Sequence, residues 1–149
     1  MIDLRLEVNG TKQVEQKLHI AADHISDFSP AFRDIKNSFI RYQRQEFASQ
    51  GAYGGFAFAP LSPKYAKWKA KNHPGKRILE ISGDLRKSMT SGLQVVTSPR
   101  RMVMWSDSTI AGYHQDGTEK MPARKMVAVP REEKRDWVRF LQRYIVGSR

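Results

Sequence analysis

The four histidines are the side chains best suited to bind a metal ion, and they occupy positions 19, 24, 73 and 114. A protein zinc site needs three or four histidine, cysteine or carboxylate ligands held at fixed spacings. His19 and His24 are five residues apart, so on an ideal helix they point about 140° away from each other. The chain has no cysteine that could add a thiolate ligand. The histidine pattern therefore does not predict a metal site, and we expect no cofactor.

The run from Tyr113 to Asp116 places an imidazole beside a carboxylate, a combination that could perform acid–base chemistry or bind a metal. Gly117 follows directly and can adopt a positive φ. A turn of this kind is more often a hydrogen-bonded structural corner than the site of a small hydrolase. We therefore expect His114, Gln115 and Gly117 to build a fixed corner. The chain also lacks a Gly-x-Ser-x-Gly elbow, a phosphate loop and a dinucleotide fingerprint, so we expect no enzyme.

The length of 149 residues predicts one domain, residues 1–149, large enough for a real core. Hydrophobic residues make up 40% and charged residues 28%, which is typical of soluble globular proteins. No apolar run approaches the ~20 residues that would span a membrane, and the first residues do not resemble a secretion signal. We expect folding in a cytoplasm, without disulfides and without membrane contact.

The net charge of +11 is concentrated in two blocks. Residues 60–90 contain eight basic and two acidic side chains, and residues 120–149 contain nine basic and three acidic ones. Such clustering indicates an acidic protein partner or nucleic acid, although a pair of solvated helices in a basic protein would look the same. The basic residues lack interleaved exposed aromatics and a known nucleic-acid motif, which argues against a stand-alone nucleic-acid-binding protein. Three acidic residues are interspersed in the last block and would repel a phosphate track, so we favour a protein partner over DNA.

The first half of the chain predicts a strand and two long helices. Residues 2–8 alternate apolar and charged side chains, as a half-buried strand does. Helices are predicted from Thr11 to about Ser26 and, after the capping pair Ser29-Pro30, to about Ser49. Their apolar stripes are Val14, Leu18, Ala21 and Ile25 in the first helix, and Phe32, Ile35, Phe39 and Tyr42 in the second. The second stripe is too short for an autonomous coiled coil and should pack within the domain or against a neighbouring subunit.

Residues 50–59 form a glycine-rich loop that carries three aromatic side chains, Tyr53, Phe56 and Phe58. Aromatic residues are unusual on a loop that faces only water. We expect them to fold back onto the core, with contact to another subunit or partner as the alternative.

The second half predicts short elements followed by a final helix. Ser62 and Ser82 can each cap a short helix, and residues 93–97 and 101–105 are predicted to form a hairpin. A helical turn is predicted over residues 109–115, a strand over residues 125–129, and a helix from Arg131 to about Val146. The expected architecture is α+β: long N-terminal helices, a small antiparallel β-sheet, and a C-terminal helix packed on that sheet.

Three phrases, in order along the chain, resemble the phage virion-morphogenesis (tail-completion) family. They are Ala59-Pro60-Leu61-Ser62-Pro63-Lys64-Tyr65, then Ile78-Leu79-Glu80-Ile81-Ser82-Gly83-Asp84-Leu85-Arg86-Lys87-Ser88, then Tyr113-His114-Gln115-Asp116-Gly117-Thr118 with Pro122-Ala123-Arg124. The chain departs from the family pattern at Phe58, where tryptophan is usual, at Ser82, where a capping threonine is usual, and at Lys125, where a second proline is usual. Related neck proteins of long-tailed phages share the Gly-x-Leu and His-x-Gly phrases.

This resemblance implies a structural protein that acts at the head–tail junction, as tail-completion or neck protein, in the virion of a tailed phage or prophage. It implies a homo-oligomeric ring that contacts other neck and tail proteins, such as a connector or tail terminator, and adjoins the packaged DNA. Pro122 and Arg124 would belong to the corner with Tyr113. Arg131, Arg135 and Arg139 would dock on an acidic partner, and the alternative is a stand-alone basic nucleic-acid-binding protein.

Overall fold

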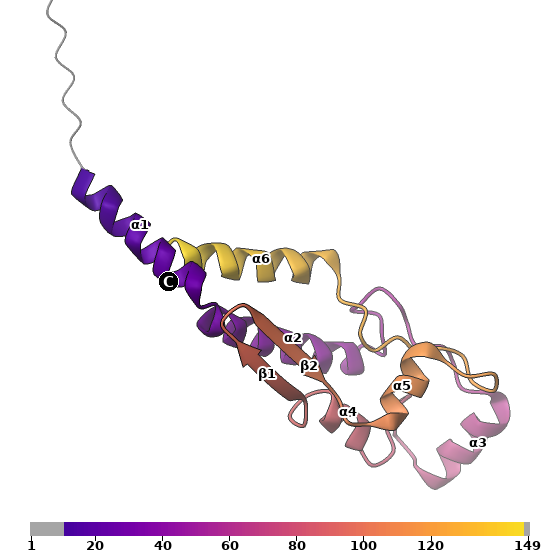
Figure 1. Cartoon of the computed structure of the whole chain (residues 1–149). Helices are drawn as coiled ribbons and strands as arrows, with labels where there is room; N and C mark the ends of the chain where they lie inside the picture. Colours follow the sequence, from indigo (N-terminus) through magenta and orange to yellow (C-terminus); the bar gives the residue numbers. More distant parts are fainter. Residues whose placement is uncertain (1–10, 148–149) are drawn as a thin grey trace, which may run out of the picture.

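Two long helices begin the part of the chain that the computed structural model describes, residues 11–147 (Figure 1). They are α1 (Thr11–Ser26) and α2 (Ser29–Ala48), as predicted. The cap between them differs from the expectation, because the carboxylate of Asp27 accepts the Ser29 N–H at 2.8 Å and the Ser29 side chain makes no capping bond. The strand predicted for residues 2–8 lies outside the described residues.

The last helix, α6 (Arg131–Ile145), packs against α2 and α1. Trp137 lies 6.3 Å from the ring of Phe39 on α2, and Tyr144 stacks at 4.3 Å on His24 of α1. The α+β class is confirmed, but the expected packing of α6 on the sheet is wrong. The aromatic stripe of α2 offers α6 a larger apolar surface than a two-stranded sheet could.

The predicted hairpin is confirmed as β1 (Gln94–Ser98) and β2 (Arg101–Trp105), paired antiparallel. Val95, Met102 and Met104 lie on its half-buried face, and β1 contacts α2. The N–H of Phe28 donates to the carbonyl of Pro99 at 2.7 Å, which fastens the hairpin turn to the start of α2.

Three short helices occupy the end of the molecule away from α1 (Figure 1). They are α3 (Pro63–Asn72), α4 (Asp84–Ser88) and α5 (Thr109–Asp116). Ser62 caps α3 as predicted, because its side chain accepts the N–H of Tyr65. Gly83, with φ of 93°, takes the position before α4 that was expected for Ser82.

The strand predicted for residues 125–129 is wrong. This segment has no strand partner, and the Gln115 side chain accepts the N–H groups of Met126 at 2.9 Å and Val127 at 3.0 Å. A side-chain amide thus satisfies the backbone donors that a neighbouring strand would otherwise satisfy.

The aromatic residues of the glycine-rich loop divide between core and surface. Phe58 is 6% exposed and packs in the cluster of Phe47, Leu85, Met89, Ala111 and Met126. Tyr53 and Phe56 are 43% and 54% exposed. Tyr53 nevertheless lies 5.8 Å from the Tyr42 ring and donates its hydroxyl to Glu133 at 2.8 Å.

A buried carboxylate holds this loop to α2. Glu46 is 0% exposed and accepts the Gly54 N–H at 2.6 Å. A Cβ atom at position 54 would lie 2.7 Å from the Tyr42 hydroxyl and 2.8 Å from a carboxylate oxygen, so a larger residue would displace the ends of these two side chains. Burial raises the pKa of Glu46, and the bond from Gly54 only partly opposes that change.

The raised pKa predicts a pH-dependent effect of Glu46→Gln. A carboxyl whose pKa is higher in the folded state stabilises the fold below its ordinary pKa of about 4.3, and this stability is lost as pH rises through the folded pKa. We expect Glu46→Gln to melt at a higher temperature than the parent at neutral pH, with the difference disappearing near pH 4. Glu119→Gln, at an exposed position, is the control. A loss of stability that is the same at every pH would contradict the argument.

Candidate functional site

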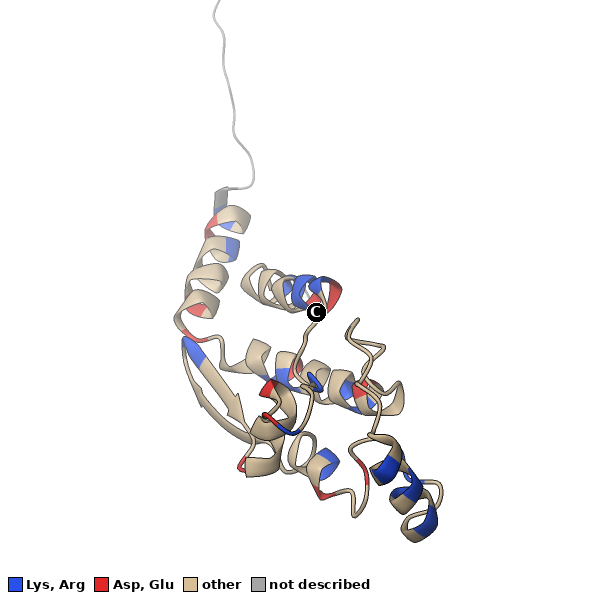
Figure 2. Cartoon of the chain, turned by 90° about the vertical axis from the view of Figure 1, so that its right-hand side faces the viewer, with Lys and Arg blue, Asp and Glu red and all other residues tan. Residues whose placement is uncertain are grey.

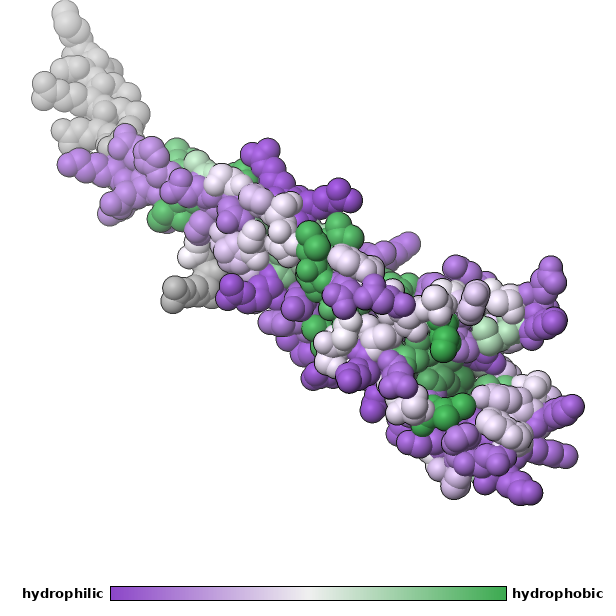
Figure 3. Space-filling model, turned by 60° about the horizontal axis from the view of Figure 1, so that its bottom comes forward, coloured by the Kyte–Doolittle hydropathy of each residue, from purple (hydrophilic) through white to green (hydrophobic). Residues whose placement is uncertain are grey.

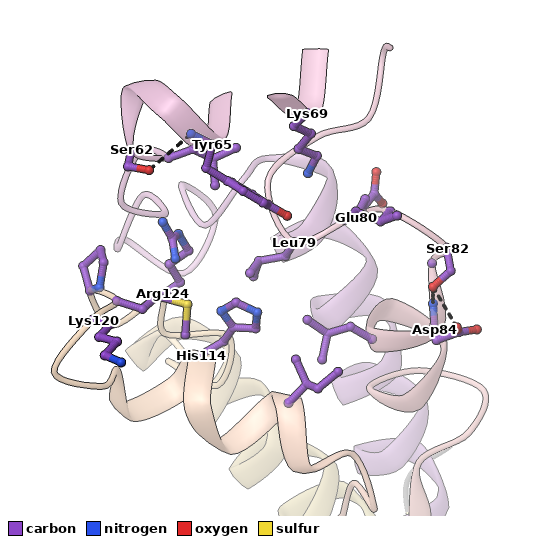
Figure 4. A pocket seen from close by; sticks show the side chains of 17 residues that line it. Ser62, Tyr65, Lys69, Leu79, Glu80, Ser82, Asp84, His114, Lys120 and Arg124 are labelled. Carbon is purple, nitrogen blue, oxygen red and sulfur yellow. Dashed lines mark hydrogen bonds between the residues drawn. The ribbon is translucent and has the colours of Figure 1, made fainter. Parts of the chain in front are cut away.

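The three family-like phrases, far apart in sequence, surround one pocket of about 460 Å³ (Figure 4). The segment 61–69 leads into α3 and forms one wall, the segment 79–85 forms a second, and residues 110–124 complete it. Figure 4 shows Tyr65 and Lys69 entering from α3, with Arg124 and His114 facing them from the opposite side. The pocket therefore gives the phrases a shared place in the fold.

Aliphatic side chains form much of the pocket wall. They are Leu61, Leu79, Ile81, Leu85, Ile110 and Met121. Leu79 has φ of 63°, a left-handed conformation that costs a non-glycine residue roughly 1–3 kcal/mol. Its side chain points toward the middle of the pocket (Figure 4). The surrounding packing thus holds an apolar surface open at some cost in backbone strain.

Arg124 links two of the phrases through backbone carbonyls. Its guanidinium donates to the carbonyls of Ala59 at 2.8 Å and Pro60 at 3.0 Å, and its backbone N–H donates to the carbonyl of His114 at 2.6 Å. The residue is 4% exposed, and burial lowers the pKa of the guanidinium, which still stays protonated. Arg124 therefore fixes the pocket wall and brings a buried positive charge to it.

Lys69 is a second buried cation in the same pocket. It is 4% exposed and donates its ammonium to the carbonyl of Arg77. Burial lowers the pKa of Lys69, nearby Glu80 raises it, and Arg124 lowers it again. Glu80 itself pairs with Arg86 at 3.3 Å. Among the described residues, no carboxylate lies within 4.0 Å of the charged groups of Lys69 or Arg124.

His114 also lines the pocket, whose remaining charged lining residues are Glu80, Asp84 and Lys120. Its Nδ1 is buried and has no hydrogen-bond partner among residues 11–147. Burial, and then the charge of Arg124, lower the pKa of His114, so the imidazole is neutral at pH 7. An apolar wall, two cations without a carboxylate partner and a neutral imidazole together suit a ligand in which a carboxylate adjoins an apolar group.

Hydrogen bonds are present at the predicted corner of His114, Gln115 and Gly117. Besides the two bonds accepted by Gln115, the Gly117 N–H donates to the carbonyl of Tyr113 at 3.0 Å. Pro122 lines the pocket, whereas Tyr113 is 59% exposed. Within the part of the chain that is described, no group of three or more His, Cys, Asp or Glu residues could hold a metal ion. The corner stays a prediction, which these contacts support.

The expected partner-contact residues do not come together. Phe58 lies in the core. The ammonium of Lys125 lies over the ring of Phe56, 5.2 Å from the ring centre. Arg131, Arg135 and Arg139 follow one side of α6, where the last two border a shallow groove. Arg139 pairs with Asp136 at 2.8 Å. Figure 2 shows basic residues on α3 and mixed charge on α6.

Sequence reasoning did not identify Lys69 as a pocket residue. A lysine in a lysine-rich helix normally faces water. The available signal was its spacing of four residues from Tyr65, which places both side chains on one face of the helix.

Two glycines test the corner, Gly112 within α5 and Gly117 directly after it. Gly117 has φ of 79° and ψ of 178°, and an added Cβ would lie 2.8 Å from the Ala123 nitrogen. We expect Gly117→Ala to cost roughly 1–3 kcal/mol of unfolding free energy, measured by urea denaturation. Gly112 lies within the helix with open space around it, so Gly112→Ala should instead stabilise by roughly 0.5–1 kcal/mol. Equal effects of the two substitutions would show that the corner is not fixed.

A family model described as the phage virion morphogenesis family matches residues 9–145. No curated protein and no solved structure matches the chain. No helix among the described residues is long and apolar enough to cross a membrane. The family match covers most of the chain, including all three phrases around the pocket. The chain belongs to the phage virion morphogenesis family, and its role lies in virion assembly.

Proposed function

We propose that the protein is a structural component of the head–tail junction of a tailed phage or prophage. It completes the tail or neck so that the tail joins a filled head, and it acts as a homo-oligomeric ring beside a connector or tail terminator. Family membership indicates an assembly role and contact with other virion proteins. The observation that carries the proposal is the convergence of the three family phrases on one pocket.

The pocket docks a segment of a neighbouring virion protein. The segment presents a carboxylate to Lys69 and Arg124 and an apolar side chain to the aliphatic wall. A guanidinium has five N–H donors and an ammonium has three, so donors remain after the bonds to Ala59, Pro60 and Arg77. Because both cations are already buried, much of their desolvation cost is met during folding, and a carboxylate gains their attraction on docking.

Contact with packaged DNA is a second candidate, supported by α3. Its sequence, Pro63–Asn72, contains four lysines and no acidic residue, and Tyr65 stacks on Trp68 at 5.3 Å with both rings partly exposed. The expectation that no exposed aromatics lie among the basic residues is therefore wrong for α3. Cations beside exposed aromatics are typical of surfaces that bind nucleic acid without reading its sequence. DNA binding by the purified protein that weakens steeply with salt would favour this candidate.

Lys69→Met tests the docking pocket. The substitution removes one buried cation but keeps a long apolar stem, so the protein should fold. A lost charged hydrogen bond is worth about 1.5–3 kcal/mol, so we expect infectious titre to fall on the order of tenfold or more. Electron microscopy should then show unjoined heads and tails. The control is Lys71→Met, at an exposed position of the same helix. Normal joining with Lys69→Met would remove this cation from the docking mechanism.

A further inference from the structure

Two exposed apolar surfaces of this chain lie on different elements. The arm stripe consists of Val14, Leu18, Ala21 and Ile25 on α1, and its three larger side chains are 57%, 64% and 46% exposed. The hairpin face consists of Val96, Val103 and Trp105, which are 58%, 37% and 42% exposed. Figure 3 shows apolar residues gathered in separate exposed patches among hydrophilic ones. The other face of the hairpin is half-buried, whereas α1 contacts α6 near His24.

The α1 helix extends beyond the body of the molecule (Figure 1). Every side chain from Lys12 to Ile20 is exposed, and the contacts with α6 come from the end near His24. The arm stripe lies roughly a quarter turn around the helix from His24, so α6 does not cover it. A helix shorter than about 12–15 residues is marginal in water without tertiary packing. The outer half of α1 therefore needs a surface to pack on.

The hairpin face has the geometry to receive a helix. Val96 lies directly across from Val103 in the antiparallel register, and Trp105 is on the same face. A two-stranded hairpin becomes stable when helices or further strands cover it, and here α2 covers one side. The arm stripe spans roughly 16 Å along its helix, close to the roughly 17 Å of a five-residue strand.

We infer that the arm stripe of one copy packs on the hairpin face of the next copy. The arm cannot reach its own hairpin, because the His24–Tyr144 stack and the Tyr144 hydroxyl bond to the Asp27 carbonyl hold α1 along α6. Each copy offers one surface of each kind, so the contact is head-to-tail and repeats until it closes a ring. Arg101 shares the hairpin face and Glu15 flanks the arm stripe, which adds opposite charges at the edge.

This inference rests on the proposed ring and names the surfaces that build it. Leu18→Glu places a charge in the arm stripe and leaves the hairpin face unchanged. Val96→Glu places a charge in the hairpin face and leaves the arm stripe unchanged. Both positions are exposed, so each variant should fold. By native mass spectrometry we expect each variant alone to remain a monomer at concentrations where the parent forms a ring. Gln16→Glu, which adds the same charge on the far side of α1, should leave the ring intact.

Mixing the two variants gives the decisive measurement. The intact arm of Val96→Glu can pack on the intact hairpin face of Leu18→Glu, and the remaining two surfaces are spoiled. A head-to-tail contact therefore predicts a heterodimer that grows no further. If Leu18→Glu blocked assembly and Val96→Glu did not, the arms would pack on each other and the inference would be overturned. Rings that tolerate both substitutions would overturn it too, while leaving the proposed ring standing.

If the ring forms only on the tail and not in solution, cross-linking within phage particles tests the same contact. The chain has no cysteine, so in a variant with both Leu18→Cys and Val96→Cys every disulfide between copies involves these two positions, and peptide mapping identifies the 18–96 bond. Oxidised particles should yield a ladder of linked copies, and the pair Gln16→Cys with Val96→Cys should not. Particles that contain the protein but give no ladder would overturn the packing proposed here. Completed particles without the protein would instead overturn the proposed function.

Discussion

Buried Arg124 is the constraint on which the pocket depends. Its guanidinium gives up water for the carbonyls of Ala59 and Pro60, and its backbone N–H holds the carbonyl of His114. A buried cation is costly unless such partners stay in place. The loop before α3 and the corner after α5 must therefore keep one relative position. The segment with the strained Leu79 forms the neighbouring wall of the pocket. The pocket is therefore formed in the free protein, before a partner binds.

The charges around this frame give the pocket its selectivity. A cation that is paired with a carboxylate of the same chain attracts a negatively charged ligand only weakly. Arg86 is paired in this way with Glu80, and Arg139 with Asp136. Lys69 and Arg124 are bonded only to carbonyl dipoles, which orient them without neutralising their charge. The neutral imidazole of His114 adds no further positive charge. The pocket lining contains Lys69, Lys120 and Arg124 against Glu80 and Asp84, so its net charge is positive and it favours a carboxylate over a cation.

Local signals explain which parts of the fold could be predicted. The hairpin, the Ser62 cap and the two long helices follow from patterns within a few residues, and the structure confirms them. The strand predicted for residues 125–129 was wrong because a distant side chain, Gln115, satisfies that backbone. The position of α6 depends on which apolar surface of the folded chain is largest. No pattern of neighbouring residues in the sequence gives that information. Lysine and glutamate side chains are normally exposed to solvent, so the residue types alone did not predict the burial of Lys69 and Glu46.

The arrangement of surfaces along the molecule bears on how it assembles. The pocket lies among α3, α4 and α5, at the end opposite α1 (Figure 1). Contacts between copies through the arm and the hairpin would therefore leave the pocket open on every copy. A closed ring would then present one pocket per subunit in a circle, and many weak docking contacts would act together. Each pocket can then bind its segment weakly while the ring as a whole holds firmly, so that assembly errors can still dissociate before the ring is fully engaged.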